Sequence, residues 1–235
     1  MSHELKNPLN AIIGYSEILI EDVRETETQK CKDVTSIRSA GYRLLGLIND
    51  LLELSRLEAG KVEVRIEEFE FADFLEALVS RSRPTIAASG NELLVQLPPA
   101  GRIACDSQKL LRVVEGLLSN AAKFTSNGHI TLAASMRNDS WVVSIEDTGV
   151  GIAQPRMASL FETFGRSEDE TASKYGDEVR LGLPLAYRYC QLMGGTLSVQ
   201  SELGRGSKVT VTLPRQARRV EERTDARMQL QGQAA

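Results

Sequence analysis

A histidine and a carboxylate stand next to each other near the start of the chain, at His3 and Glu4, with Asn7 four residues after the histidine. An imidazole can act as a nucleophile when a nearby base takes or orients its proton. On a helix, residues four apart share a face, so Asn7 would lie beside His3. A solvated surface histidine is the alternative for such an isolated pair, and the rest of the chain has to decide between the two.

Three later groups could bind a nucleotide. Asn120 and Lys123 are spaced for one helical face, where an amide oxygen can ligate Mg²⁺ and an ammonium can meet phosphate oxygens. Asp147 could accept a hydrogen bond from an adenine amino group. Glycines beside it, and in a second turn, would let a backbone approach closely; these are Gly149, Gly151, Gly204 and Gly206. Each group alone also fits a solvated helix face or an ordinary turn.

The elements before residue 61 are helical. Apolar residues recur at alternating steps of three and four in residues 1–24, and again from Val34 to Leu51, which is a heptad pattern. A helix over 30–58 would be about 43 Å long, too long for its wide apolar stripe to be buried by one partner helix. We therefore expect two copies of the hairpin to form a four-helix bundle in a homodimer.

From residue 61 the pattern changes to a mixture of strands and helices. Strands are predicted over 62–66, 93–97, 130–136, 141–146, 196–200 and 208–213, and helices over 71–88, 107–124 and 183–192. The fold class is α+β: a helical hairpin at 1–60, then a two-layer α/β sandwich at 61–214 with helices on one face of a mixed sheet. Residues 215–235 are polar and are expected to be a disordered tail.

The composition of the chain argues against several classes of function and location. The net charge of −4 argues against nucleic-acid binding. The three cysteines form no CxxC pair, so neither a disulfide framework nor a zinc site is indicated. No run approaches the ~20 apolar residues that span a bilayer, so we expect no membrane contact by these residues and a cytoplasmic location. Because the motif begins so near Met1, we expect the chain to be the cytoplasmic part of a longer protein.

Together and in this order, these segments resemble the core of sensor histidine kinases, with a phospho-acceptor hairpin followed by a Bergerat-type (GHKL) ATP-binding domain. The resemblance covers about residues 1–214. It implies that His3 accepts the phosphoryl group of ATP, that Glu4 takes or holds its Nδ1 proton, and that Asn7 belongs to an E-x-x-N phosphatase pattern. In the second domain it implies that Asn120 binds Mg²⁺, Lys123 the phosphates and Asp147 the adenine. Glycines would shape the pocket: Gly149, Gly151, Gly182, Gly204 and Gly206. The implied partner is the receiver domain of a response regulator.

Two positions depart from the family pattern. Gly116 stands where many members have a second amide, and Glu115 beside it points about 100° away on the helix. In the lid, Val179-Arg180 replaces a glycine that would expose helix amides to phosphate. These departures keep open a degenerate kinase that acts as a phosphatase or scaffold. A metabolic ATPase or chaperone of the same superfamily is a more distant alternative, because it would leave the His3 hairpin without a purpose.

Overall fold

The computed structural model describes residues 9–10, 12–19, 28–97, 100–157, 159–161 and 181–216. The chain divides into two compact units, residues 1–62 with 160–185 and residues 63–159 with 186–235. His3, Glu4, Asn7, the lid residues 176–180 and the tail from 217 lie outside the described residues.

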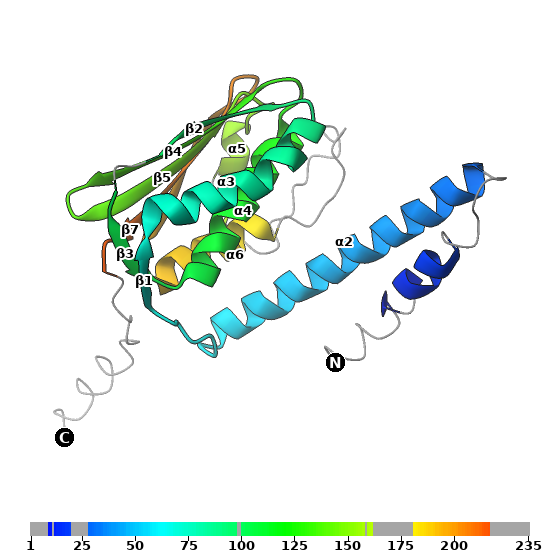
Figure 1. Ribbon diagram of the computed structural model, residues 1–235, viewed down its shortest axis with the longest axis horizontal. Coiled ribbons are helices and arrows are strands. Elements are labelled where there is room, and N and C mark those ends of the chain that lie inside the picture. The colour runs from blue at the N-terminus through cyan, green and yellow to red at the C-terminus, as the bar shows by residue number, and fades with distance from the viewer. Residues whose placement is uncertain are drawn as a thin grey trace. The chain divides into compact units, whose positions relative to one another are not determined.

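The described part of the N-terminal unit contains the predicted helical hairpin (Figure 1, blue). Residues 12–19 are helical and lie against α2, which spans Thr28–Glu58. At 31 residues, α2 is about 46 Å long. A Cβ built on Gly41 would lie 2.8 Å from Cγ1 of Ile13, so the two helices approach closely at this glycine. The Tyr42 hydroxyl also donates a 2.8 Å hydrogen bond to Glu17, which fixes the register of the pair.

The predicted strand over 62–66 is wrong. Residues 61–66 have no regular secondary structure, and the first strand, β1, is Glu67–Glu70, paired antiparallel to β3, Arg102–Cys105. Alternating valines satisfy the strand pattern, but the backbone N–H of Arg65 donates to the Asp106 carboxylate at 2.9 Å instead of to another strand. The Asp106 carboxylate thus accepts the N–H that, in a strand, would donate to the backbone carbonyl of a neighbouring strand.

The main sheet has five strands in the order β2-β4-β5-β7-β6. The strands are β2 Glu92–Gln96, β4 His129–Arg137, β5 Ser140–Asp147, β6 Thr196–Glu202 and β7 Gly206–Pro214. Only β2 and β4 pair in parallel; the other three pairs are antiparallel, so the sheet is mixed, as predicted. Asn138 and Asp139 have positive φ at the tight turn between β4 and β5.

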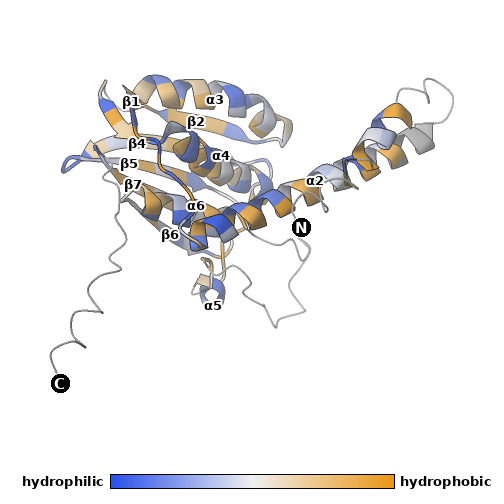
Figure 2. Cartoon of the chain, turned by 90° about the horizontal axis from the view of Figure 1, so that it is seen from below, coloured by the Kyte–Doolittle hydropathy of each residue, from blue (hydrophilic) through white to orange (hydrophobic). Residues whose placement is uncertain are grey.

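Three helices, α3 Phe71–Ala88, α4 Ser107–Phe124 and α6 Gly182–Leu192, lie on one side of this sheet (Figure 2). Between the layers, Trp141 is fully buried with its ring centroid 4.7 Å from that of Phe71. Strand residues alternate between this apolar core and a more exposed face. A single helical turn, α5 Gln154–Met157, follows the loop after β5. These layers confirm the predicted two-layer α+β class.

Two buried polar side chains fix the ends of α4. Asp106 caps the helix by accepting from the backbone N–H of Lys109 at 3.0 Å and from its Nζ at 2.7 Å. Burial favours a higher pKa for Asp106, but the hydrogen bonds from Lys109 and Arg65 prevail and lower it. At the other end, Asn91 donates to the Thr125 carbonyl at 2.9 Å and accepts from the Gly128 N–H at 3.0 Å. The helix that carries Asn120 and Lys123 is therefore held at both ends.

Three further features concern the end of the second domain, the cysteines and the hydropathy of the helices. Arg215 and Gln216 still pair with Ala104 of β3, so ordered backbone extends two residues beyond 214. Cys105 and Cys190 are buried, and burial raises the pKa of each thiol to about 12, as expected for inert core cysteines. No helix in the described ranges has the length and hydropathy needed to cross a membrane.

Candidate nucleotide site

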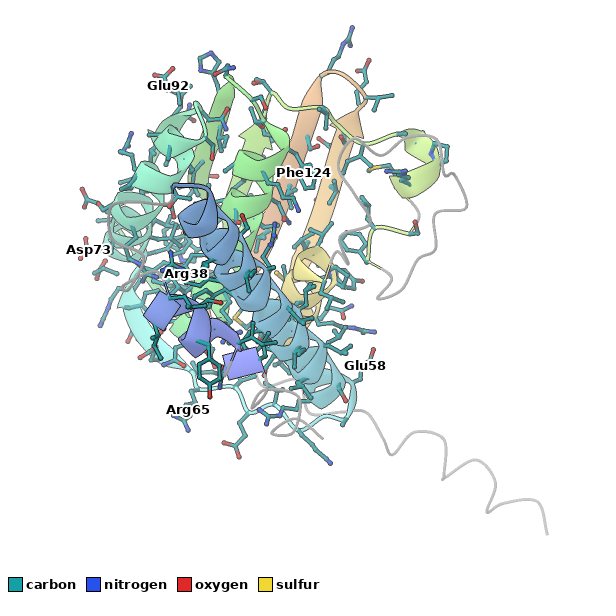
Figure 3. The ribbon with its side chains drawn as sticks, turned by 90° about the vertical axis from the view of Figure 1, so that its right-hand side faces the viewer. Arg38, Glu58, Arg65, Asp73, Glu92 and Phe124 are labelled. Carbon is teal, nitrogen blue, oxygen red and sulfur yellow. The ribbon has the colours of Figure 1, made fainter. Side chains whose placement is uncertain are left out.

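Three segments that are far apart in the sequence meet at one place in the second unit. They are the C-terminal end of α4, the loop 147–152 after β5, and the turn 203–206 between β6 and β7. Phe124, labelled in Figure 3 at the end of α4, accepts a hydrogen bond from the Val150 N–H at 3.1 Å. The Val150 carbonyl in turn accepts from the Gly204 N–H at 2.8 Å. The predicted Asp-x-Gly-x-Gly and Gly-x-Gly motifs are thus brought together.

Asp147 is the half-buried acid at the centre of this arrangement. Burial raises its pKa, and this effect outweighs the hydrogen bonds from the backbone of Gly149 and Ser207, which lower it. The Gly149 N–H donates to Oδ1 at 2.9 Å. Thr125 also faces the carboxyl and lowers its pKa, yet its buried hydroxyl makes no hydrogen bond of ordinary geometry. The Thr125 hydroxyl is therefore a second polar group beside the Asp147 carboxylate, which suits a site that receives a polar ligand.

The structure shows which backbone the glycines allow to approach: it is that of the neighbouring segments of the site itself. A Cβ on Gly149 would collide with the Phe124 carbonyl oxygen, and a Cβ on Gly206 would collide with the Asp147 carbonyl oxygen. Gly151, with φ of +67°, would collide with the backbone of Glu202. These glycines therefore allow the three segments to pack backbone against backbone. Gly204 lies in open space, and its φ of +79° serves the turn itself.

Asn120 and Lys123 lie on the last turns of α4. Asn120 is about one turn before Phe124, and Lys123 directly precedes it. Asn120 is half-buried and Lys123 is exposed, with its Nζ 5.3 Å from the centroid of the Phe124 ring. Gly116 lies one turn before Asn120, and a Cβ added there would meet no atom within 4 Å, so an amide side chain would fit. Glu115 instead binds Arg81 of α3 at 2.5 Å, which directs its carboxylate away from the Asn120 face.

The chemistry of Mg²⁺ agrees with the donors present. The described residues contain no cluster of three His, Cys, Asp or Glu side chains that could cage a metal. Mg²⁺ usually binds through one or two protein oxygens together with substrate phosphates and water. A single amide oxygen from Asn120 fits that mode, with the nucleotide supplying the other ligands.

Some predicted residues are not joined to this cluster by the structure. His3, Glu4 and Asn7 fall outside the described residues, and Gly182 is the first residue of α6, in the first compact unit. Conversely, Thr125, Ser201 and Ser207 were missed by the sequence reasoning. Thr125 directly follows the Asn120 helix, and the two serines flank the second glycine turn, so adjacency to the motifs was the signal available.

Comparisons with known proteins agree with this geometry. Residues 1–60 match the family model "His Kinase A (phospho-acceptor) domain", and residues 105–217 match "Histidine kinase-, DNA gyrase B-, and HSP90-like ATPase". The chain is 35% identical over 222 residues to the autoinducer 2 sensor kinase/phosphatase LuxQ of Vibrio parahaemolyticus, covering 91% of this chain and 26% of LuxQ. It is 38% identical to the non-motile and phage-resistance protein of Caulobacter vibrioides, again with 91% and 26% covered.

Among solved structures, full-length ShkA in complex with AMPPNP matches with a TM-score of 0.76 and 30% identity, over 93% of this chain and 45% of that one. The histidine kinase AdeS of Acinetobacter baumannii shares the fold, with a TM-score of 0.64 and 21% identity over 90% and 97% of the two chains. The chain therefore belongs to the sensor histidine kinases and carries both parts of their catalytic core. It spans about a quarter of the length of the curated relatives it matches.

Proposed function

We propose that this core is an ATP-dependent protein-histidine kinase that phosphorylates His3 and then passes the phosphoryl group to an aspartate of a response regulator. The observation that carries the proposal is the meeting of Asp147, the end of α4 and the glycine turn at one site. That convergence supplies a held acceptor for adenine and, on the adjoining helix, an amide and an ammonium for the phosphates. A cytoplasmic location follows from the use of ATP.

The second unit binds and orients the nucleotide in this proposal. Asp147 accepts a hydrogen bond from the adenine amino group, and Lys123 neutralises phosphate charge. Bound at Asn120, Mg²⁺ would offset the charge that develops on the transferred phosphoryl group. Phosphoryl transfer depends mainly on positioning and charge neutralisation, so these few side chains suffice.

His3 is the nucleophile in the proposed reaction. Its Nε2 forms a bond to the γ-phosphorus as the bond to the ADP oxygen breaks. The Glu4 carboxylate takes or holds the Nδ1 proton, which offsets the positive charge that the ring gains. Neighbouring residues do not face each other on a regular helix. Pro8 would help, because its ring crowds the carbonyl of Glu4 at i−4 and bends the helix.

Homodimerisation is the proposed assembly, and the exposed apolar side chains of the hairpin support it. Ile37, Leu44 and Leu51, spaced by seven on α2, are 43–50% exposed, and the first helix exposes Ile12 and Leu19 to a similar degree. A stripe of this kind favours burial against a second hairpin. A receiver domain would then dock on the resulting bundle near His3.

The alternative function is response-regulator dephosphorylation or scaffolding with weak use of ATP. Gly116 favours it, because the helix turn before Asn120 offers no second amide. Relatives named as kinase/phosphatase are consistent with both the addition of phosphate to a response regulator and its removal. Asn7 is the residue we assign to the orientation of water in the phosphatase reaction.

Incubation with Mg²⁺ and γ-labelled ATP, beside a His3→Gln variant, tests the two functions. Label that is acid-labile, alkali-stable and confined to the parent would establish the kinase. No label on a folded parent would contradict the kinase, and removal of phosphate from a phosphorylated receiver domain by the parent would then support the alternative.

A further inference from the structure

The hydroxyl of Ser201 lies at the junction between the loop after β5 and the turn between β6 and β7. Ser201 is near the end of β6 and is half-buried. Its Oγ accepts a hydrogen bond from the Ile152 N–H at 2.8 Å. It also lies 2.9 Å from the Gly206 carbonyl oxygen and 2.9 Å from the Ser207 hydroxyl.

Proton counting fixes the direction of each of these bonds. A serine hydroxyl has one proton to donate and two lone pairs with which to accept. A carbonyl oxygen can only accept, so the Ser201 proton goes to Gly206. The Ile152 N–H takes one lone pair, and Ser207 must therefore donate to the other. Every hydrogen-bonding position of the Ser201 hydroxyl is used. Its partners are Ile152, in the loop after β5, and Gly206 and Ser207, at the start of β7.

These partners lead directly to the acid at the centre of the site. The backbone of Ser207 hydrogen-bonds the Asp147 carboxylate, and Ile152 ends the loop that begins at Asp147. Two other described contacts join this loop to the segment after β6: the Gly204 N–H donates to the Val150 carbonyl, and the Ser207 backbone bonds the Asp147 carboxylate. Without the Ser201 hydroxyl, the Ile152 end of the loop would lose its hydrogen bond to β6, while the contacts at Val150 and Asp147 would remain.

We infer that Ser201 is a positioning residue for nucleotide recognition: its hydroxyl holds the 147–152 loop against the β6–β7 turn so that the Asp147 carboxylate keeps its orientation. The inference rests on the proposed function, in that the nucleotide is taken to bind at Asp147. Ser201 itself is not assigned a contact with ATP. Its action is indirect, through the backbone that carries Asp147.

The test compares Ser201→Ala, Ser201→Cys and Ser201→Thr with a matched control, Ser198→Ala, an exposed serine on the same strand. Affinity for AMPPNP with Mg²⁺ would be measured by titration calorimetry. Amide hydrogen exchange of Ile152 and the midpoint of thermal unfolding would be measured on the same nucleotide-free samples. Cysteine nearly preserves the volume of serine and hydrogen-bonds weakly, so it provides a folded variant if alanine does not fold.

We expect Ser201→Ala and Ser201→Cys to weaken nucleotide binding about fivefold to tenfold and to accelerate exchange at Ile152. Ser201→Thr should restore both, and Ser198→Ala should change neither. Unchanged affinity and exchange in the alanine and cysteine variants would overturn the inference, as would an equal effect of Ser198→Ala. If the parent bound no nucleotide, the proposed function would fail, while exchange at Ile152 would still decide whether Ser201 holds the loop.

Discussion

At the scale of single residues, Asp147 is the residue to which we assign adenine recognition in the proposed function. Its carboxylate is held by the Gly149 N–H and is half-buried, which suits a specific acceptor for an adenine amino group. Replacing it by Asn removes the negative charge that strengthens a hydrogen bond from the adenine amino group. We expect Asp147→Asn to weaken nucleotide binding about 10- to 100-fold, the range for losing a hydrogen bond to a charged group. Titration calorimetry with AMPPNP and Mg²⁺ would measure the loss.

The control for that change is the preceding residue. Glu146 lies on the opposite face of β5 and binds Lys208 at 2.8 Å on the exposed side of the sheet. Glu146→Gln should therefore leave nucleotide affinity within about twofold, because exposed ion pairs contribute little. Equal losses in the two variants would show that Asp147 is not the specific acceptor.

The raised pKa of Asp147 gives binding and stability opposite dependences on pH. Recognition needs the ionised carboxylate, so affinity should fall on acidification at a higher pH than an ordinary aspartate would produce. In the absence of nucleotide, the folded protein holds this proton to a higher pH than the unfolded chain does. Its contribution to the free energy of unfolding is therefore lost as pH rises through the folded-state pKa.

Affinity and unfolding measured across this pH range would check both signs. In the Asp147→Asn variant, the part of the pH dependence of affinity and of unfolding that comes from Asp147 should disappear, because an amide does not titrate. If the nucleotide affinity of the parent stayed constant as the pH fell to the ordinary pKa range of an aspartate, the assignment of Asp147 as the adenine acceptor would be contradicted.

At the scale of elements, α4 offers a direct test of whether Gly116 limits the use of ATP. The position has room for a side chain and lies one turn from Asn120 on the same face. Gly116→Asn should tighten binding of Mg²⁺ with nucleotide severalfold and speed labelling of His3. It should also raise the free energy of unfolding by a few tenths of a kcal/mol, because glycine is a poorer helix former. Gly46→Asn, in α2 with the same open surroundings, is the control for the helix effect alone.

The helix α2 carries the prediction about assembly. Leu44 is 50% exposed on the heptad stripe, whereas Ser39 is exposed on the opposite face of the same helix. A charge on the stripe would be buried in a bundle, so Leu44→Asp should shift the protein toward monomer while Ser39→Asp should not. Sedimentation or light scattering at several concentrations would measure this. A Leu44→Asp variant that stays dimeric would place the interface elsewhere.

The elements also show which features the sequence could reveal. The helix over 107–124 was predicted with its observed bounds from its apolar period, and the structure adds that Asp106 caps its N-terminal end. Strand β3 was missed and 62–66 was misassigned, since both depend on a pairing partner that local patterns do not specify. Likewise, the motifs indicated Asp147 as a candidate, but the hydrogen bonds of the Ser201 hydroxyl to Ile152, Gly206 and Ser207 exist only once those segments have folded together.

At the scale of the whole molecule, the cluster around Asp147 is built entirely from residues of the second compact unit, while His3 belongs to the first. Nucleotide binding and phosphoryl acceptance should therefore be separable. We expect His3→Gln to abolish labelling by γ-labelled ATP while leaving the affinity for Mg²⁺ with AMPPNP within about twofold of the parent, since no contact of Asp147 is altered.

Asp147→Asn provides the reciprocal variant for that separation. It should lose nucleotide affinity and labelling together but remain dimeric, because the exposed stripe on α2 is untouched. Mixing the two variants in one dimer would then bring an intact His3 from one protomer together with an intact nucleotide site from the other. Labelling of that mixed dimer would show that a protomer phosphorylates its partner, and absence of label would show transfer within one chain. If His3→Gln itself weakened nucleotide binding, the proposed division of tasks between the two units would be wrong.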